Sequence, residues 1–150
     1  MTTSSTKHIL AAALCLLTVT GCGGRGKEGD PRVRSDGRLV RVSLDDLGQK
    51  RGSYFTYTAS GDRKVAFIVY RESTGTFRAV LDACRKCYRW RRGYVINGDH
   101  VVCRKCGEHY ELDNLAGGRG SCIPIPLTSS REGNSIVIPV TELEAGARYF

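Results

Sequence analysis

Apolar positions after residue 38 follow the pattern of β-strands more than that of helices. Residues 39–44 alternate between apolar and polar side chains, which is typical of a strand with one buried face. Residues 54–58 are aromatic and β-branched, a composition that favours a pleated surface. Residues 64–70 form a nearly continuous apolar segment, and a turn at 72–75 leads to a partner strand at 76–81. The first half of the folded chain is therefore predicted to be antiparallel sheet.

The clearest hairpin of the sequence follows. Residues 94–96 and 100–102 flank Asn97-Gly98, and this dipeptide provides the positive φ values of a type I′ turn. Residues 136–138 form a late strand, and Pro139 should end this strand or place it at a sheet edge.

Helical periodicity is weak beyond the N-terminal segment, and residues 141–147 could form one terminal turn of helix. The predicted fold class is all-β, a small antiparallel sheet or sandwich. The length of 150 residues fits one such domain, assigned to residues 39–150.

The N-terminus has the pattern of an export signal. Lys7 precedes an apolar segment at residues 9–19, which is shorter than the roughly 20 residues that a transmembrane helix needs. The segment ends in Val-Thr-Gly-Cys, which resembles a bacterial lipobox. Residues 1–21 are therefore expected to be a lipoprotein signal peptide, Cys22 the lipidated residue and residues 22–38 a flexible linker. These features predict a lipid-anchored protein of the cell envelope, facing the periplasm or the cell exterior.

The sequence contains seven cysteines, and four of them form two Cys-x2-Cys motifs. Cys84 and Cys87 form the first, Cys103 and Cys106 the second, with 15 residues between the motifs. This spacing is typical of a four-thiolate metal site, in which two tight turns converge on one ion or cluster. The predicted hairpin between them, on whose two ends they lie, should bring the turns together.

Three chemistries remain open for these thiols. An iron–sulfur cluster is the first expectation, but soft thiolates also suit zinc, iron and copper ions. Exported cysteines are often oxidised, so structural disulfides or thiol–disulfide exchange are the other possibilities. An odd number of cysteines beyond the lipid site argues against disulfides alone.

Cys122 lies between a glycine-rich segment and a Pro-x-Pro sequence. Such a sequence predicts a stiff, extended loop that could cover the metal site. Cys122 is then either an additional ligand or thiol beside the metal, or a buried cysteine that packs as a small hydrophobic residue.

Positive charge is concentrated at the motifs. The formal net charge of the chain is +8, and Asp99 is the only acidic residue between Cys84 and Cys106. Basic residues in this segment should stabilise a negatively charged thiolate centre and attract an acidic partner. The candidates for partner docking are Arg85, Lys86, Arg104 and Lys105. Nucleic acid is not an expected ligand of an anchored, exported protein.

The sequence from about Val40 to Pro139 resembles the FtrD-like membrane iron–sulfur protein family. The resemblance is carried by Leu-Asp-Ala-Cys-Arg-Lys-Cys-Tyr at 81–88, by Gly93-Tyr94 and Gly98-Asp99, by Val-Cys-Arg-Lys-Cys-Gly at 102–107, and by Cys122-Ile123-Pro124.

The resemblance implies an iron–sulfur or other metal centre and a role in extracytoplasmic electron transfer or iron uptake. It further implies that Cys84, Cys87, Cys103, Cys106 and Cys122 are the functional thiols. Two departures are visible. The chain has the pattern of a lipoprotein instead of a membrane-spanning protein, and Ser121 and Ile123 flank Cys122 where the family tends to have Gly and Asn.

The order of elements is also similar to that of a Rieske domain, with cysteine wherever that domain has a histidine ligand. The sequence therefore predicts a membrane-anchored electron carrier or metal-binding protein, more than an enzyme, with a redox or metal-transport protein as its partner. The alternatives are a zinc- or copper-binding module and a thiol–disulfide redox protein. No hydrolytic motif or phosphate-binding glycine loop is present in the sequence.

Overall fold

The computed structural model describes residues 30, 32–115 and 119–150. The predicted signal peptide and Cys22 lie outside these residues. Within the described part, three antiparallel sheets and one short α-helix make up the fold, which confirms the all-β class. No helix among the described residues is long and apolar enough to cross a membrane.

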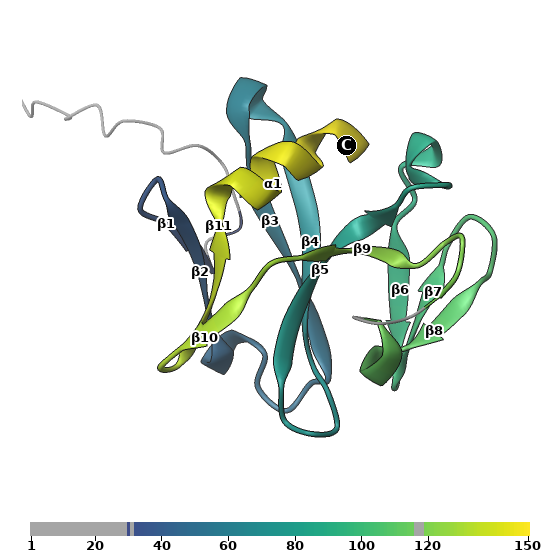
Figure 1. The fold of residues 1–150 in the computed structure, drawn as a ribbon, viewed down its shortest axis with the longest axis horizontal. Helices are drawn as coiled ribbons and strands as arrows, with labels where there is room; N and C mark the ends of the chain where they lie inside the picture. Colours follow the sequence, from purple (N-terminus) through teal and green to yellow (C-terminus); the bar gives the residue numbers. More distant parts are fainter. Residues whose placement is uncertain (1–29, 31, 116–118) are drawn as a thin grey trace, which may run out of the picture.

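Sheet A lies at the left of Figure 1 and has the strand order β1-β2-β11-β10. Its strands are β1 (Val33–Ser35), β2 (Leu39–Ser43), β10 (Ser130–Glu132) and β11 (Ser135–Pro139). β1 falls inside the segment predicted as linker, so the folded part begins before residue 39. β11 ends at Pro139 as expected, but it is an inner strand, because it pairs with both β2 and β10. Pro139 pairs with Leu39 of β2 at the end of the ladder.

Sheet B forms the centre of the molecule, and sheet C the right side of Figure 1. Sheet B has the order β3-β4-β5-β9 and consists of β3 (Gly52–Thr58), β4 (Lys64–Arg71), β5 (Phe77–Cys84) and β9 (Pro124–Leu127). Sheet C consists of β6 (Tyr94–Asn97), β7 (His100–Cys103) and β8 (His109–Glu111). The remaining elements are α1 (Val140–Gly146) and the 3₁₀ turns η1 (Leu44–Asp46), η2 (Ser60–Asp62), η3 (Tyr88–Trp90), η4 (Leu112–Asn114) and η5 (Ala147–Tyr149).

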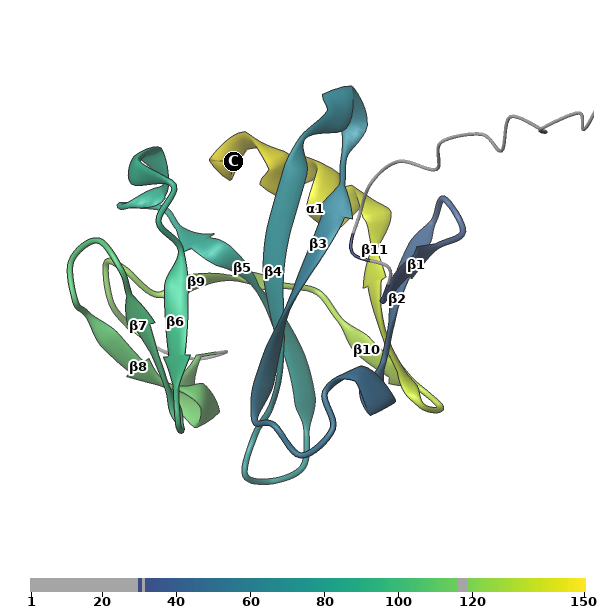
Figure 2. The same cartoon turned by 180° about the vertical axis from the view of Figure 1, so that it is seen from behind.

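Sheet B is buried on both faces, which explains the continuous apolar sequence of β4. Because successive side chains of a strand point to opposite faces, Phe67 and Val69 belong to the core shared with sheet A, and Ile68 and Tyr70 to the core shared with sheet C. Figure 2 shows the central position of β3, β4 and β5 between the two outer groups of strands. The second core also contains four of the cysteines, so the thiols lie between sheets B and C.

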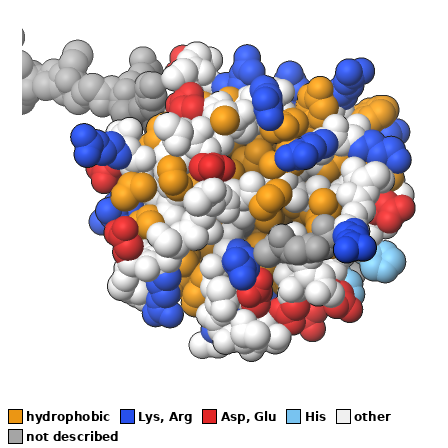
Figure 3. Space-filling model, viewed as in Figure 1, with side chains coloured by type: hydrophobic (Ala, Val, Ile, Leu, Met, Phe, Trp, Pro, Cys, Tyr) orange, Lys and Arg blue, Asp and Glu red, His pale blue; other side chains and the backbone are white. Residues whose placement is uncertain are grey.

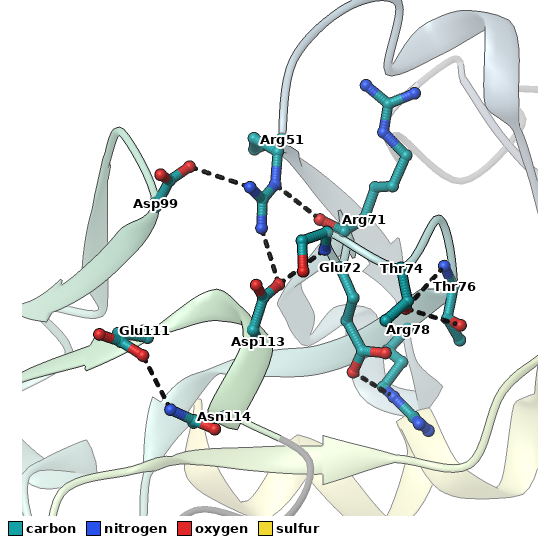
Figure 4. Close-up of polar contacts among 11 residues, drawn as sticks. Arg51, Arg71, Glu72, Thr74, Thr76, Arg78, Asp99, Glu111, Asp113 and Asn114 are labelled. Carbon is teal, nitrogen blue, oxygen red and sulfur yellow. Dashed lines mark hydrogen bonds and ion pairs between the residues drawn. The ribbon is translucent and has the colours of Figure 1, made fainter.

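Arg51 connects these two sheets at the opposite end from η3. Its guanidinium donates to the carbonyl oxygen of Arg71 at 2.8 Å and forms ion pairs with Asp99 at 3.0 Å and Asp113 at 2.8 Å (Figure 4). Asp113 also accepts a hydrogen bond of 2.8 Å from the backbone N–H of Ser73. These contacts hold the hairpin of sheet C against the β4–β5 turn, which helps to fix where the second Cys-x2-Cys motif lies.

Candidate metal centre

Each Cys-x2-Cys motif begins on the last residue of a strand. Cys84 ends β5, and the turn that follows brings the N–H of Cys87 to 3.0 Å from the Cys84 sulfur. Cys103 ends β7, and Gly107, with φ +77°, donates its N–H to the Cys103 carbonyl oxygen at 2.9 Å. A glycine is favoured here because the turn requires a positive φ. Both turns therefore present sulfur atoms at strand ends, as the sequence predicted.

Cys122 occupies the centre of the thiol group. Its sulfur lies 3.1 Å from that of Cys84, 3.2 Å from those of Cys87 and Cys106, and 3.6 Å from that of Cys103. The five cysteines are all free thiols, and all except the exposed Cys106 are buried. The structure thus brings all five predicted thiols together, and it places the thiol of the predicted covering loop, Cys122, at their centre.

Two tyrosines hold the backbone of Cys122. The hydroxyl of Tyr94, at the start of β6, donates to the carbonyl oxygen of Cys122, and the hydroxyl of Tyr110, in β8, accepts from its N–H at 3.2 Å. Gly120 permits this arrangement, because a Cβ there would lie 2.6 Å from the Tyr110 ring. The Cys122 loop is therefore hydrogen-bonded to sheet C through both the N–H and the carbonyl oxygen of Cys122.

The metal-free thiols differ in pKa. Burial alone would raise the pKa of Cys84, but hydrogen bonds from the Cys122 thiol and from the N–H groups of Cys87 and Lys86 lower it overall. Burial raises the pKa of Cys87 to about 11 and strongly raises that of Cys122. A bound cation would replace the protons of these buried thiols, so metal binding and thiol ionisation are coupled here.

Asp82 and Tyr94 are site residues that the sequence analysis did not identify. The Asp82 carboxylate accepts a hydrogen bond of 2.6 Å from the Tyr94 N–H and packs against Gly93, whose φ is +60°. Burial raises the pKa of Asp82 to about 6. Two sequence signals pointed to this contact: the alternation of β5, which places Asp82 on the same face as Cys84, and the presence of Asp82 and Gly93-Tyr94 among the residues that carry the family resemblance. No signal indicated Tyr110.

The surface around the two motifs is basic. The four predicted docking residues, Arg85, Lys86, Arg104 and Lys105, are all exposed. Lys105 lies over the ring of Trp90 with its Nζ 4.7 Å from the ring centroid, and the Trp90 side chain is 52% exposed. In Figure 3, Lys and Arg side chains gather over the upper right of the face shown, the region that η3 occupies in Figure 1.

The donor set fits a thiolate-bound metal. The sulfur atoms of Cys84, Cys87, Cys103 and Cys122 all lie within 4.8 Å of one another. Four thiolates suit zinc, copper(I) and iron–sulfur clusters, and hard cations such as magnesium are a poor match. A cavity of about 270 Å³ is lined by Cys84, Cys87 and Cys103, and its lining also includes the basic residues Arg91, Arg92, Arg104 and Lys105.

A small all-β domain with a buried multi-cysteine site defines a class of metal-binding or iron–sulfur domains. Residues 47–150 match the family model described as membrane iron-sulfur containing protein FtrD-like. The chain belongs to this family, as the sequence resemblance indicated. Neither the comparison with curated proteins nor that with solved structures gives a significant match.

Proposed function

We propose that this protein is a lipid-anchored, extracytoplasmic electron carrier that holds an iron–sulfur cluster and takes part in iron handling. The observation that carries the proposal is the convergence of five thiols, four of them buried, in a member of an iron–sulfur family. A cysteine-ligated iron–sulfur cluster supplies one-electron transfer, at a lower potential than a histidine-ligated cluster. The cysteines hold the cluster, and the loop fixed by Tyr94 and Tyr110 limits the access of water.

The first test is an anaerobic assay of iron and acid-labile sulfide on the purified protein, combined with an absorption spectrum. Iron with stoichiometric sulfide and visible bands that bleach with dithionite would support the electron carrier. Stoichiometric zinc or copper without labile sulfide would contradict it and favour the metal-binding module. If a thiol count of the protein as isolated shows these cysteines to be in disulfide bonds, thiol–disulfide exchange would be favoured.

Docking of an acidic redox partner on the basic surface is part of the same proposal. Arg85, Lys86, Arg104 and Lys105 are exposed residues of the two Cys-x2-Cys turns, and Cys106 beside Lys105 is the exposed thiol of the site. Trp90 offers an exposed aromatic side chain of the kind that anchors interfaces. Opposite charge accelerates encounter, and salt screens this effect.

Two small oxidants of opposite charge test the docking surface without a known partner. The reduced protein should be oxidised faster by the anion ferricyanide than by the cation hexaammineruthenium(III), once driving force is allowed for, and salt should reduce the difference. Replacing Arg104 and Lys105 with Glu should slow the oxidation of the reduced protein by ferricyanide at least tenfold. The same replacements at Arg34 and Arg38, exposed residues in and near β1, are the control and should have a small effect. Equal effects of the two pairs would contradict the assignment.

The lipid anchor is tested separately. The protein produced in a bacterium should be recovered with membranes and carry a diacylglyceryl group on Cys22. Cys22→Ser should abolish the modification and release the protein from the membrane fraction. An unmodified N-terminus in the wild-type protein would contradict the anchor and leave the metal centre unaffected.

A further inference from the structure

Five thiols are present where a tetrahedral metal or a small cluster needs four ligands. The spacing of the two motifs assigns the ligands to Cys84, Cys87, Cys103 and Cys106. In the structure, the group that is both compact and buried is a different one, because it contains Cys122 in place of Cys106. The exposed fractions of its members are 2% for Cys84, 8% for Cys87, 3% for Cys103 and 0% for Cys122.

The distances within this group fit a metal ion. Four thiolates at about 2.3 Å from one ion lie about 3.8 Å from one another. The sulfur of Cys122 already lies 3.1 to 3.6 Å from those of Cys84, Cys87 and Cys103, and all pairs in the group are within 4.8 Å. Small shifts of side chains would therefore suffice to surround an ion. The Tyr94 and Tyr110 hydrogen bonds keep Cys122 in place for this role.

Cys106 has a different environment. It lies in the turn between β7 and β8, its side chain is exposed, and its sulfur is 3.2 Å from that of Cys122. It is thus the one thiol of the five that is open to solvent and also contacts the central sulfur. A metal bound to Cys106 would be in reach of Cys122 without any movement of the backbone.

We propose that Cys84, Cys87, Cys103 and Cys122 hold the metal centre and that Cys106 is a transfer thiol, through which the metal enters and leaves. This inference rests on the metal-binding part of the proposed function. The transfer is a ligand substitution with no change in oxidation state. The bond from the metal to the Cys122 sulfur forms, the bond to the Cys106 sulfur breaks, and the thiol proton of Cys122 passes to water.

A matched pair of Cys→Ser variants separates the two roles. Cobalt(II) alone is the probe, because its absorption bands report the number of thiolate ligands and its loading can be followed in a stopped-flow instrument. Cys106→Ser should bind one cobalt ion with band intensities equal to those of the wild type, but load at least tenfold more slowly. Cys122→Ser should show weaker thiolate bands and an affinity lower by at least a hundredfold.

The opposite pattern would overturn the ligand assignment: full cobalt binding by Cys122→Ser and loss of binding in Cys106→Ser. Equal loading rates of Cys106→Ser and the wild type would overturn the transfer role and leave the metal site intact. If the wild-type protein binds no metal through its cysteine thiolates, the proposed function itself fails.

Cys122 is buried, so its variant could fold poorly, and a measurement on the wild type provides an independent test. The cobalt-loaded full chain is treated with iodoacetamide, and the modified peptides are mapped by mass spectrometry. Among the five thiols of the site, Cys106 alone should be alkylated rapidly. Protection of Cys106 as complete as that of Cys84 would contradict the proposal.

Discussion

The sulfur atoms of Cys84 and Cys122 lie 3.1 Å apart, although 38 positions separate the two residues in the chain. The reason is a strand pairing, since Cys84 at the end of β5 is opposite Pro124 of β9. The segment that leads into β9 therefore passes beside the first Cys-x2-Cys turn, and the Cys122 sulfur lies between the sulfur atoms of the two Cys-x2-Cys turns. The candidate metal centre thus depends on the edge of sheet B as much as on the hairpin of sheet C.

Removing the Tyr94 hydroxyl should loosen the Cys122 loop. Tyr94 is buried, and in Tyr94→Phe the carbonyl oxygen of Cys122 loses its hydrogen-bond donor. We expect the free energy of unfolding of the metal-free, reduced protein to fall by about 1–2 kcal/mol in urea denaturation. Tyr88→Phe is the control, because no hydrogen bond of the Tyr88 hydroxyl is found among the described residues. Equal stability of the two variants would argue against the contact.

Gly93 should tolerate no side chain. Gly93 and Gly98 have similar φ values of +60° and +58°, but a Cβ at Gly93 would collide with the Asp82 carboxylate, whereas a Cβ at Gly98 would meet nothing within 4 Å. Gly98→Ala should cost about 1 kcal/mol from backbone strain alone. Gly93→Ala should cost at least twice as much and weaken metal binding. Thermal unfolding of both variants measures the difference, and similar losses would show that Asp82 moves freely.

Asp82 should make stability depend on pH. Burial raises its pKa to about 6 in the folded protein from 3.8, so the folded state holds the proton more tightly. The stabilisation from this proton is complete below pH 4 and is lost as pH rises through 6. Asp82→Asn removes this dependence and keeps an oxygen for the Tyr94 N–H.

The unfolding free energy of Asp82→Asn should therefore exceed that of the wild type above pH 6, by up to about 3 kcal/mol, and the gap should close toward pH 4. Denaturant titrations of the metal-free, reduced proteins at several pH values measure this gap. A difference that is constant with pH would contradict the raised pKa.

Arg51→Met should loosen sheet C while sheet A remains protected. The variant loses one partly buried hydrogen bond to a main-chain carbonyl and two exposed ion pairs. A loss of about 1 kcal/mol in stability is expected. Hydrogen exchange should increase in β7, β8 and η4. Arg78→Met, which breaks the ion pair with Glu72 inside one hairpin, serves as the control and should leave exchange in sheet C unchanged.

Much of the fold could be predicted because its signals are local. The apolar sequence of β4, a hairpin around Asn97-Gly98 and the terminal helix each follow from neighbouring residues, and the structure confirms these elements at nearly the expected positions. The predicted type I′ turn is wrong, because Asn97 ends β6 and pairs with His100, so that Gly98 and Asp99 form the turn and only Gly98 has a positive φ, of +58°. Residues 124–127 were predicted to belong to a stiff, extended loop. They form β9, an edge strand of sheet B, where the missing N–H groups of Pro124 and Pro126 can be tolerated.

The sequence by itself determined that the protein is all-β and that two pairs of cysteines lie on turns able to bind a metal. Strand alternation, the place of a hairpin turn and Cys-x2-Cys spacing act over a few residues, so the local sequence encodes them. Only the tertiary structure decided that Cys122 lies at the centre and Cys106 at the surface. That arrangement depends on the β5–β9 pairing and on the hydroxyls of Tyr94 and Tyr110. These contacts join segments that are far apart in the chain, and the pattern of apolar and polar residues within one segment does not indicate which other segment it will contact.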